Sequence, residues 1–456
     1  MSKLADRFRV NMTEGPEGRV LLRFALPMIV GNLLQQSCGF LEAWIVGRHI
    51  GPDALAVSGS AAGLMLFINS ILIGFGMGAQ VQFSLLHGSR EPELERQSHS
   101  LATLFSIVLT LVLFAALRLG RSGLTALLRV DPLIRPDVHR YLDIISLGLP
   151  ATAAVNLFGS LLRARGDALR PVLVFSSAAV LNILLALLLV IGLDGGVTGA
   201  AWATVGAQNF AAISMTFLIR HELPQFSLRR LGGAAALARQ LARLAVLTSL
   251  QQSIMNFGGL MIQSLVNSFG YVATAGMTAG LRIDALVHTP LGDYANAFSV
   301  FVSVNHGAGL RERLVRGYRV ALATTAAFAL PVSLLVVVMA PRLIGLIVGP
   351  DAAATLAVGV SYLRIEGAAF VGIAWLLLHY ALFRGLGDAG KSVLLTVISL
   401  GTRVLLAYAL AARGLHWIWI AIPTGWLLAD LTGVCLWRRH LRMDGRSGLD
   451  DIGRTR

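Results

Sequence analysis

One carboxylic acid near the start of the chain has the setting of a proton-binding group. Glu42 lies in the apolar stretch GFLEAWIVG, with Gln35 and Gly39 seven and three residues before it, so a helix places all three on one face. An ionisable side chain inside a long apolar segment is costly unless it faces a cavity or a partner. We therefore predict that Glu42 binds and releases a proton. The alternative is a glutamate that reaches interfacial water and has no special role.

Polar side chains in the second half of the chain form two more helix faces. The members of each set are three, four or seven residues apart, which is the spacing of one face. The sets are Gln252, Asn256, Gly259 and Gln263, and Arg282, Thr289, Asp293 and Asn296. Asp284 and His288, four residues apart, form a separate pair. Such side chains either line a wet cavity or hold helices together in lipid.

We predict a substrate cavity that draws on both faces and on one residue near Glu42. Its candidate residues are Gln35, Gln252, Asn256, Gln263, Arg282, Asp284, Asp293 and Asn296. Three further charged residues have structural interpretations. Arg403 and Asp430 could neutralise one another, and Glu366 lies near the outer end of its apolar segment.

Enzyme motifs are scarce in this sequence. It contains neither HExxH nor GxSxG. Its two cysteines, Cys38 and Cys435, are too isolated to suggest a disulfide framework or a metal site. We expect a protein that is not an enzyme, binds no metal, needs no cofactor and does not use ATP.

The composition requires lipid around most of the chain. Of 456 residues, 55% are hydrophobic and 14% are charged, and the mean hydropathy is +0.71, whereas soluble domains have about 25% charged residues. The net charge of +14 raises the question of nucleic-acid binding. The basic residues, however, lie in short connections between apolar segments, where they act as topology signals. We expect a membrane protein that binds no nucleic acid.

Twelve apolar segments are long enough to cross a hydrocarbon core of about 30 Å as helices. They are Leu21–Val46, Ala54–Leu86, Leu101–Leu117, Tyr141–Leu162, Val172–Gly192, Val197–Ile219, Leu241–Ser268, Val272–Asn305, Tyr318–Ala340, Leu356–Phe383, Ser392–Ala412 and Leu415–Trp437. An even number puts both termini on one side, and the distribution of Lys and Arg makes that side cytoplasmic. We predict a multi-pass protein of the plasma membrane, which in a bacterium is the inner membrane.

The second half of the chain repeats the first. Three groups of residues recur in the same order, 221 or 219 residues later. They are Arg163, Gly166 and Asp167 with Arg384, Gly387 and Asp388, Tyr141 and Leu142 with Tyr362 and Leu363, and Gly51, Ala54 and Ala56 with Gly270, Ala273 and Ala275. The Arg, Gly and Asp groups read as tight turns with local charge pairing. Six segments in each copy make the repeat parallel.

The repeat defines an all-α integral membrane fold of two six-helix lobes. We predict a cytoplasmic N-terminal segment at 1–20, an N-lobe at 21–219 and a cytoplasmic linker at 220–240. A C-lobe at 241–437 and a cytoplasmic C-terminal tail at 438–456 complete the chain.

These features together resemble the multidrug and toxic compound extrusion (MATE) transporters, in the branch of the NorM and DinF proteins. The resemblance covers roughly residues 21–437. It rests on ALPMIVGNLLQQSCGFLEAWIVGRHIGPDALAVSG, the paired turns RARGD and RGLGD, LNILL, GVTGAAWAT and RIDALVHTPLGDYANAFSVFVSVNHGAG. It implies two lobes around a central V-shaped cleft that alternates between the two faces. It also implies export of organic, often cationic, compounds against an inward flow of protons or sodium.

The resemblance assigns roles to particular residues. An acidic residue of the first helix serves ion coupling in the family, and Glu42 has that place, with Asn182 and Thr204 beside it. Ala186 stands where the family often has a second carboxylate, and the family acids of helices seven and ten have no counterpart. Because sodium prefers several hard oxygen ligands, we expect H⁺ as the coupling ion.

We therefore predict a proton-coupled multidrug antiporter that acts as a monomer on small organic substrates. Arg282 and Asp284 resemble the Arg and acidic residue of helix eight in DinF-like members. A flippase for a lipid-linked sugar or a peptidoglycan precursor is the alternative, but it should carry several cavity arginines, and Arg282 is the obvious one here. A membrane enzyme such as a lipid transferase is a third possibility.

Overall fold

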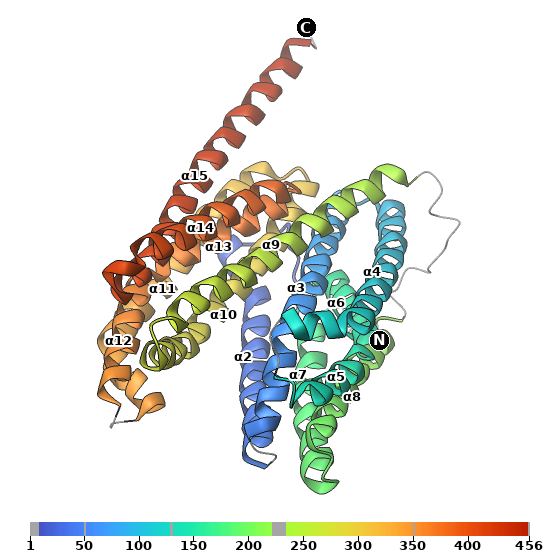
Figure 1. The fold of residues 1–456 in the computed structure, drawn as a ribbon. Coiled ribbons are helices and arrows are strands. Elements are labelled where there is room, and N and C mark those ends of the chain that lie inside the picture. Colours follow the sequence, from blue (N-terminus) through green and yellow to red (C-terminus); the bar gives the residue numbers. More distant parts are fainter. Residues whose placement is uncertain (1–8, 50–51, 128–130, 221–233, 350–351, 455–456) are drawn as a thin grey trace. The chain divides into compact units, whose positions relative to one another are not determined.

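The computed structural model describes residues 9–49, 52–127, 131–220, 234–349 and 352–454, and over these residues the chain is helical without any strand (Figure 1). In chain order the elements are α2 (Glu17–His49), α3 (Pro52–Gly88), α4 (Pro92–Leu127), α5 (Arg135–Ser146), α6 (Leu149–Ala164), α7 (Leu169–Ala186), η1 (Leu187–Gly192), α8 (Gly196–Ile219), α9 (Ala235–Asn267), α10 (Tyr271–Gly307), α11 (Arg311–Val348), α12 (Ala353–Ala368), α13 (Phe370–Gly385), α14 (Ala389–Leu410), η3 (Ala411–Arg413) and α15 (Leu415–Arg454). The predicted all-α class is confirmed for this part of the chain.

Seven helices in the described ranges are long and apolar enough to cross a membrane, and two bent helix pairs raise the number to nine. The bent pairs are α5 with α6, at 44°, and α12 with α13, at 55°. The remaining long helices, α8, α9 and α10, have 24, 33 and 37 residues. They fall outside this group because polar side chains interrupt their apolar surface. Twelve crossings in two lobes stay a prediction.

The two bent pairs differ from the single helices predicted over 141–162 and 356–383. Between α5 and α6, Gly148 is followed by Pro150, which lacks an N–H and sits in the first turn of α6. Gln208 Oε1 occupies the space that a Cβ on Gly148 would need. Between α12 and α13, the N–H of Ala369 turns back to the carbonyl of Glu366 at 2.9 Å. Both segments are apolar on average, so hydropathy alone predicted no break.

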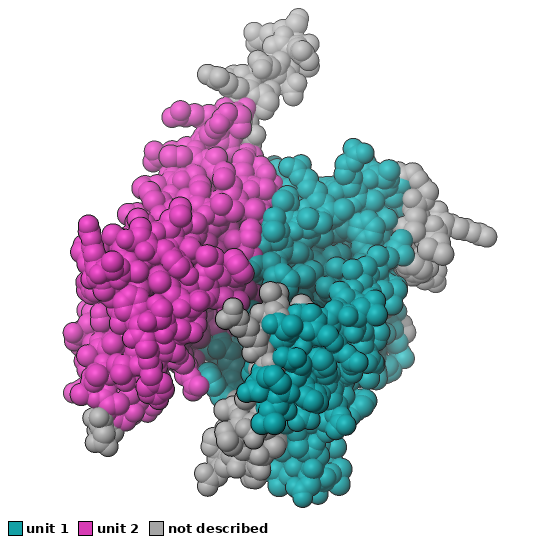
Figure 2. All heavy atoms as spheres, viewed as in Figure 1, with its two compact units in different colours: residues 1–253, 299–316, 385–387 teal, residues 254–298, 317–384, 388–456 magenta. Residues whose placement is uncertain are grey.

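The chain divides into two compact units, shown in teal and magenta in Figure 2. Unit 1 contains residues 1–253, 299–316 and 385–387, and unit 2 contains residues 254–298, 317–384 and 388–456. Helices α9 and α10 each contribute to both units. Of the linker predicted at 220–240, residues 221–233 lie outside the described residues. The predicted lobe boundaries therefore stay a prediction.

Small residues allow close helix packing in unit 1. A Cβ on Gly78 of α3 would lie 2.6 Å from the backbone nitrogen of Ala245 in α9. Nearby, the hydroxyl of Thr248 in α9 donates to the carbonyl of Gly74 in α3 at 2.5 Å. In lipid, burying an apolar side chain between helices gains little, because the lipid tails are equally apolar. Helices therefore associate through close packing, which small residues permit. The backbones of α3 and α9 therefore touch directly.

One reciprocal contact within unit 1 relates the two halves of the sequence. A Cβ on Gly88 at the end of α3 would overlap the carbonyl oxygen of Val304 in α10, and a Cβ on Gly307 would overlap the carbonyl of Leu85. Residues 85 and 88 correspond to 304 and 307 at the interval of 219 found in the sequence. The ends of α3 and α10 thus meet through equivalent positions, as expected of a parallel repeat.

Unit 2 uses the same kind of packing. A Cβ on Gly280 of α10 would overlap the ring of Tyr362 in α12, and one on Gly433 of α15 would lie 2.8 Å from His379 Cγ in α13. Trp419 of α15 is fully buried, and its ring stands edge-on to Tyr362 with the ring centroids 5.1 Å apart. These contacts bring buried polar side chains of several helices close together.

Apolar side chains also cover much of the outer surface. Large exposed residues include Leu111 on α4, Ile213 on α8, Leu334 on α11 and Leu405 on α14. An apolar surface of this extent is unusual for a protein in water. It fits a chain whose long helices lie in a lipid bilayer.

Candidate functional site

A cavity of about 290 Å³ lies inside unit 1. Its walls come from α2, α6, α7 and α8, and its lining residues are Gln35, Cys38, Gly39, Glu42, Thr152, Val155, Asn156, Phe175, Ala178, Ala179, Asn182, Thr204, Ala207, Gln208 and Ala211. The α2 residues follow the spacing of one helix face, as the sequence predicted. A Cβ on Gly39 would meet nothing within 4 Å, so the cavity stays open beside α2.

Glu42 accepts hydrogen bonds from two neutral side chains in this cavity. Asn182 Nδ2 of α7 donates to Glu42 Oε2 at 2.7 Å, and Thr204 Oγ1 of α8 lies 3.4 Å from Glu42 Oε1. The Thr204 hydroxyl also reaches the carbonyl of Ala200 at 3.1 Å, so its bond to Glu42 is the weaker one. The structure thus brings together the three residues predicted for cation coupling. Their role in coupling stays a prediction.

The charge of Glu42 is not balanced by a cation among the described residues. Tyr141 of α5 lies within electrostatic range of the carboxyl. Two other oxygens of the cavity, Asn182 Oδ1 and Gln208 Oε1, are buried without a hydrogen-bond partner in the described part of the chain. Buried polar atoms are normally satisfied, so the site has acceptor capacity to spare. A proton or a small cation could use it.

A local irregularity follows the helix that carries Asn182. The α-helix α7 ends at Ala186, and residues Leu187–Gly192 continue as a π-helix. Ala186, where the family often has a carboxylate, is fully buried. Short π-helical segments inside helices are frequent at functional sites. Residue spacing on α7 and α8 could not have predicted this change of winding.

The cavity contains polar residues that the sequence analysis did not select. Gln208 lies four residues after Thr204 on α8, and Asn156 of α6 donates to the carbonyl of Thr152 at 2.9 Å. The spacing of Thr204 and Gln208 on one helix face was a usable signal. Thr152 and Asn156 of α6 show the same spacing of four residues, so this signal was also available for Asn156.

The eight predicted substrate residues fall into both units. Gln35 lines the cavity of unit 1, and Gln252 also belongs to unit 1. The other six belong to unit 2, so a common cavity stays a prediction. Two of them have local partners: Gln263 Nε2 donates to Asn267 Oδ1 at 2.9 Å, and Asn296 Oδ1 accepts from Arg384 Nη2 at 3.0 Å.

The remaining candidates differ in their surroundings. Arg282 is exposed, Asn256 is partly buried, and Asp284 and Asp293 are buried. Asp284 lies 3.5 Å from His288, which confirms the predicted pair within α10.

A cluster of ionisable groups forms in unit 2 around Asp284. Tyr362 Oη of α12 donates to Glu366 Oε2 at 2.7 Å, and Arg403 of α14 acts electrostatically on Glu366 and Asp284. Glu366 is 3% exposed and lies three residues before the break between α12 and α13. The second half of the chain thus buries acidic side chains close to one another. Glu366 is therefore buried inside unit 2.

The predicted pairing of Arg403 with Asp430 is wrong. Asp430 Oδ1 of α15 lies 2.8 Å from His379 Nδ1 of α13. Arg403 acts on the cluster of Glu366 and Asp284 instead. Spacing along the sequence could place neither partner, because five different helices carry these side chains.

One octapeptide, GLGDAGKS at residues 385–392, matches the pattern of a nucleotide-binding loop, although the sequence led us to expect no use of ATP. Its context differs, since it connects helix α13 to helix α14 and follows no strand. Lys391 Nζ pairs with Asp388 Oδ2 at 2.8 Å, and Ser392 Oγ donates to the carbonyl of Tyr380 at 3.1 Å. The Lys and Ser side chains thus serve the turn. The predicted local charge pairing is confirmed for the aspartate, although its partner is Lys391 and Arg384 of the same group donates to Asn296. The equivalent turn of the first half pairs Arg170 with Asp167.

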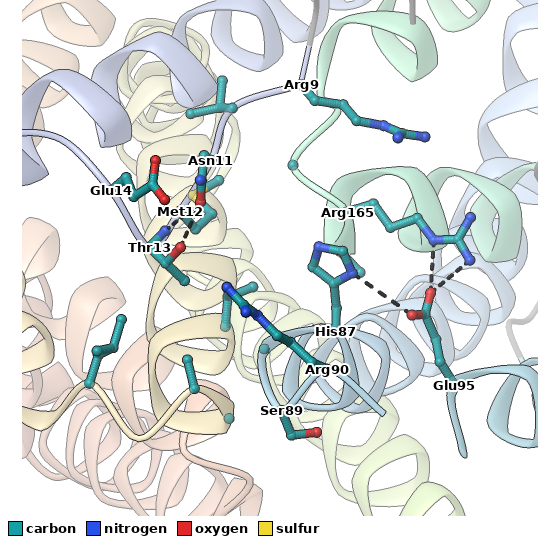
Figure 3. Close-up of a pocket in the computed structure, with 18 residues that line it drawn as sticks. Arg9, Asn11, Met12, Thr13, Glu14, His87, Ser89, Arg90, Glu95 and Arg165 are labelled. Atoms are coloured by element: carbon teal, nitrogen blue, oxygen red, sulfur yellow. Dashed lines mark hydrogen bonds and ion pairs between the residues drawn. The ribbon is translucent and has the colours of Figure 1, made fainter. Parts of the chain in front are cut away.

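A second cavity of unit 1, of about 1090 Å³, lies between the N-terminal segment 9–14 and the ends of four helices (Figure 3). Across it, Arg165 Nη2 lies 2.7 Å from Glu95 Oε1, and His87 Nδ1 lies 3.8 Å from Glu95 Oε2. Arg313 holds the segment in place by donating to the backbone carbonyls of Met12, Glu14 and Gly15 at 2.6 to 3.1 Å. Glu95 thus has a cationic partner, whereas Glu42 accepts from neutral donors.

The fold and the polar cavity define a multi-pass membrane protein with an internal polar site. The MatE family model matches the chain twice, over residues 27–188 and 248–409. The second match begins and ends 221 residues after the first, the interval of the sequence repeat. Together the matches cover more than half of the chain, which therefore belongs to the MatE family.

Proteins similar to this chain include named transporters. The probable multidrug resistance protein YpnP of Bacillus subtilis is 26% identical over 311 residues, which cover 67% of this chain and 68% of that protein. The FAD transporter of Shewanella oneidensis is 26% identical and covers 67% and 69%. DNA damage-inducible protein F of Escherichia coli is 25% identical over 448 residues, 93% of each chain.

Solved structures show the same fold. A MATE protein in complex with MaL6 superimposes with a TM-score of 0.89 and 22% identity, over 95% of this chain and 98% of that one. The family is one of transporters, not of enzymes.

Proposed function

We propose that the chain is a secondary active efflux transporter that exports organic, often cationic, compounds in exchange for protons bound at Glu42. The proposal rests on the Glu42 carboxyl, which faces a cavity and accepts hydrogen bonds from neutral donors. The names of similar proteins support export of drugs, and one of them extends the class to FAD. We place the protein in the plasma membrane as a monomer with both termini cytoplasmic.

Asn182 suits a carboxyl that changes its charge. Its amide nitrogen donates to Glu42 Oε2, while its oxygen has no partner among the described residues. An ionised carboxylate only accepts hydrogen bonds, whereas a protonated carboxyl also donates one. Asn182 can donate to the first and accept from the second. Glu42 therefore keeps a partner in both charge states.

The same carboxyl couples the proton to an organic cation. A cation in the cavity stabilises the ionised form of Glu42 and so promotes release of its proton. By linkage, protonation of Glu42 lowers the affinity for the cation by the same factor. Exchange follows if the two charge states favour opposite orientations of the site. Substrate and proton then travel in opposite directions.

Sodium is the less suitable coupling ion for this site. The oxygens near Glu42 come from Asn182, Thr204 and Gln208, and Ala186 adds none. A site with one carboxylate and few oxygens is poor in the hard ligands that metal cations of this kind need. One proton, by contrast, needs only the carboxyl and one acceptor.

The substitution Glu42→Gln tests the proposal. It keeps the size of the side chain and one acceptor oxygen but removes the titrating group. We therefore expect efflux of an organic cation from energised cells to fall to the background of cells without the transporter. Glu312→Gln is the matched control, since that carboxylate is 94% exposed. Both variants should reach the membrane in equal amounts. Normal efflux by the Glu42 variant would sink the proposal.

Proteoliposomes with imposed gradients separate the coupling ions. We expect an inward proton gradient to drive export of the organic cation and a sodium gradient alone to leave it at the passive rate. Export driven by sodium alone would overturn proton coupling. Movement of a labelled lipid-linked precursor, without any transport of organic cations, would favour a flippase instead.

A further inference from the structure

Three polar side chains from three helices of unit 2 form one buried hydrogen-bonded chain. Tyr318 lies on α11, His379 on α13 and Asp430 on α15. Asp430 Oδ1 lies 2.8 Å from His379 Nδ1, and Tyr318 Oη lies 2.9 Å from His379 Nε2. All three are buried: Tyr318 is 6% exposed, His379 1% and Asp430 7%. The Glu42 site uses none of them.

Rigid surroundings hold this chain of side chains in place. The ring of Tyr318 lies between Phe298 and Trp437, with ring centroids 6.4 and 5.4 Å away. The imidazole of His379 packs closely on Gly433, where any Cβ would lie 2.8 Å from its Cγ. Buried ionisable groups inside membrane helices are costly and are retained mainly where they work.

The geometry can satisfy two protonation states. Because the carboxylate of Asp430 accepts, His379 Nδ1 carries a hydrogen. When His379 is neutral, its Nε2 accepts a hydrogen bond from the hydroxyl of Tyr318. When His379 is charged, its Nε2 donates and the same hydroxyl turns to accept. Gain or loss of a proton therefore leaves no group without a partner.

Charge balance favours one proton on the buried pair. An ionised Asp430 beside a neutral His379 leaves a net negative charge in a buried site, which is expensive, whereas one added proton makes the pair neutral. Within the described ranges, Asp430 also acts electrostatically on two tyrosines, Tyr318 of α11 and Tyr380 of α13. Arg403 of α14 acts on Tyr380 and the Glu366 cluster.

His379 and Tyr318 also lie near one end of their helices. His379 is six residues before the end of α13 at Gly385, and Tyr318 is seven residues after the start of α11 at Arg311. At 1.5 Å per residue this is a depth of about 10 Å. The predicted topology puts both helix ends at the cytoplasm. Modest opening of these ends would admit water to the pair.

We propose that His379 and Asp430 form a second proton-binding site, with Tyr318 as its hydrogen-bonding end. In each transport cycle this site takes up one proton while it faces the outside and releases that proton to the cytoplasm. The transport role rests on the proposed antiport, whereas the binding of the proton does not. On release, an N–H or O–H bond of the pair breaks and the proton passes to water. A neutral imidazole and a carboxylate remain, and no electrons are transferred.

Nitrogen-15 NMR of the histidine rings tests the binding without any transport. In the detergent-solubilised full chain at neutral pH, we expect the signal that disappears in His379→Gln to report a proton shared with a carboxylate. In Asp430→Asn the same ring should change to a neutral imidazole. An unchanged His379 signal in Asp430→Asn would overturn the site. His416→Gln, which alters an exposed histidine of α15, serves for assignment.

The transport role is tested by counting protons per exported cation in proteoliposomes with an internal pH dye. We expect His379→Gln and Asp430→Asn each to lower the count by one, and the double variant to lower it by no more than one, because they remove the same proton. Tyr318→Phe should keep the count and slow the turnover. A wild-type count unaltered in all variants would overturn the role.

If the wild type moves no protons at all, the antiport proposal fails. The NMR experiment then still decides whether the pair binds a proton. A variant that does not stay monodisperse in detergent is replaced by the other member of the pair, since either substitution removes the site.

Discussion

At the scale of single residues, the two donors to Glu42 should differ in importance. Asn182 donates at 2.7 Å, whereas Thr204 lies at 3.4 Å and has a second acceptor. A hydrogen bond to a charged group contributes about 1.5–3 kcal/mol. We expect Asn182→Leu to reduce the initial rate of efflux about tenfold or more, and Thr204→Val about threefold. Equal losses in vesicles with matched protein content would contradict this order.

Residue types predicted the site around Glu42 but not the partner of Asp430. Glu42 stood out because a carboxyl is rare in an apolar stretch, and the family resemblance supplied Asn182 and Thr204, which the structure places beside it. The partner of Asp430 could not be read in this way. Arg403 and His379 both lie on helices close to α15 in the sequence. Only the packing of α13 against α15 makes His379 the partner of Asp430.

At the scale of helices, the glycines of α3 should divide into essential and tolerant positions. A Cβ on Gly78 would lie 2.6 Å from the backbone of Ala245, whereas a Cβ on Gly63 of the same helix would meet nothing within 4 Å. We expect Gly78→Ala to lower the stability in detergent by about 1–3 kcal/mol, the usual cost of overpacking. Gly63→Ala should leave the melting temperature unchanged or slightly raised, because alanine favours helix. Equal melting temperatures of the two variants would refute the close approach of α3 and α9.

Helices were easier to predict than their interruptions. Long apolar runs predicted the positions of most helices, because crossing lipid demands length and apolar composition. The breaks at Gly148 and Ala369 depend on tertiary contacts and on one proline, and they were missed. The octapeptide at 385–392 shows that a sequence can match a motif without forming the structure that the motif requires. Its letters match a phosphate loop, but a turn between two helices has no strand from which to build one.

At the scale of the whole molecule, the repeat was the most informative feature of the sequence. Its interval of 221 or 219 residues recurs in the two family matches and in the reciprocal contact of Gly88 and Gly307. Turn residues that recur at a fixed interval indicate a repeated arrangement of helices, because each copy of the repeat folds in the same way. The chemistry of the two halves does not follow the repeat. The polar cavity of unit 1 holds the carboxyl of Glu42 among neutral donors, and unit 2 buries several acids beside histidines and an arginine.

The number of membrane crossings decides on which side the chain ends. Seven or nine crossings, the numbers that satisfy length and apolarity, would put the two termini on opposite sides of the membrane. Twelve crossings, which add α8, α9 and α10, put them on the same side. We favour twelve, because polar residues that serve a site lower the hydropathy of a helix without preventing it from crossing. The distribution of Lys and Arg agrees with cytoplasmic termini.

Cysteine labelling measures this directly. In a chain with Cys38 and Cys435 replaced by serine, single cysteines at Arg90, Asp194 and Met443, all exposed, report on three connections. We expect a membrane-impermeant maleimide added to intact cells to label Asp194→Cys, in the predicted outer loop between α7 and α8. Arg90→Cys and Met443→Cys should react only after the membrane is permeabilised. Labelling of Met443→Cys in intact cells, with Arg90→Cys still protected, would mean an odd number of crossings and would exclude the arrangement of two parallel six-helix lobes.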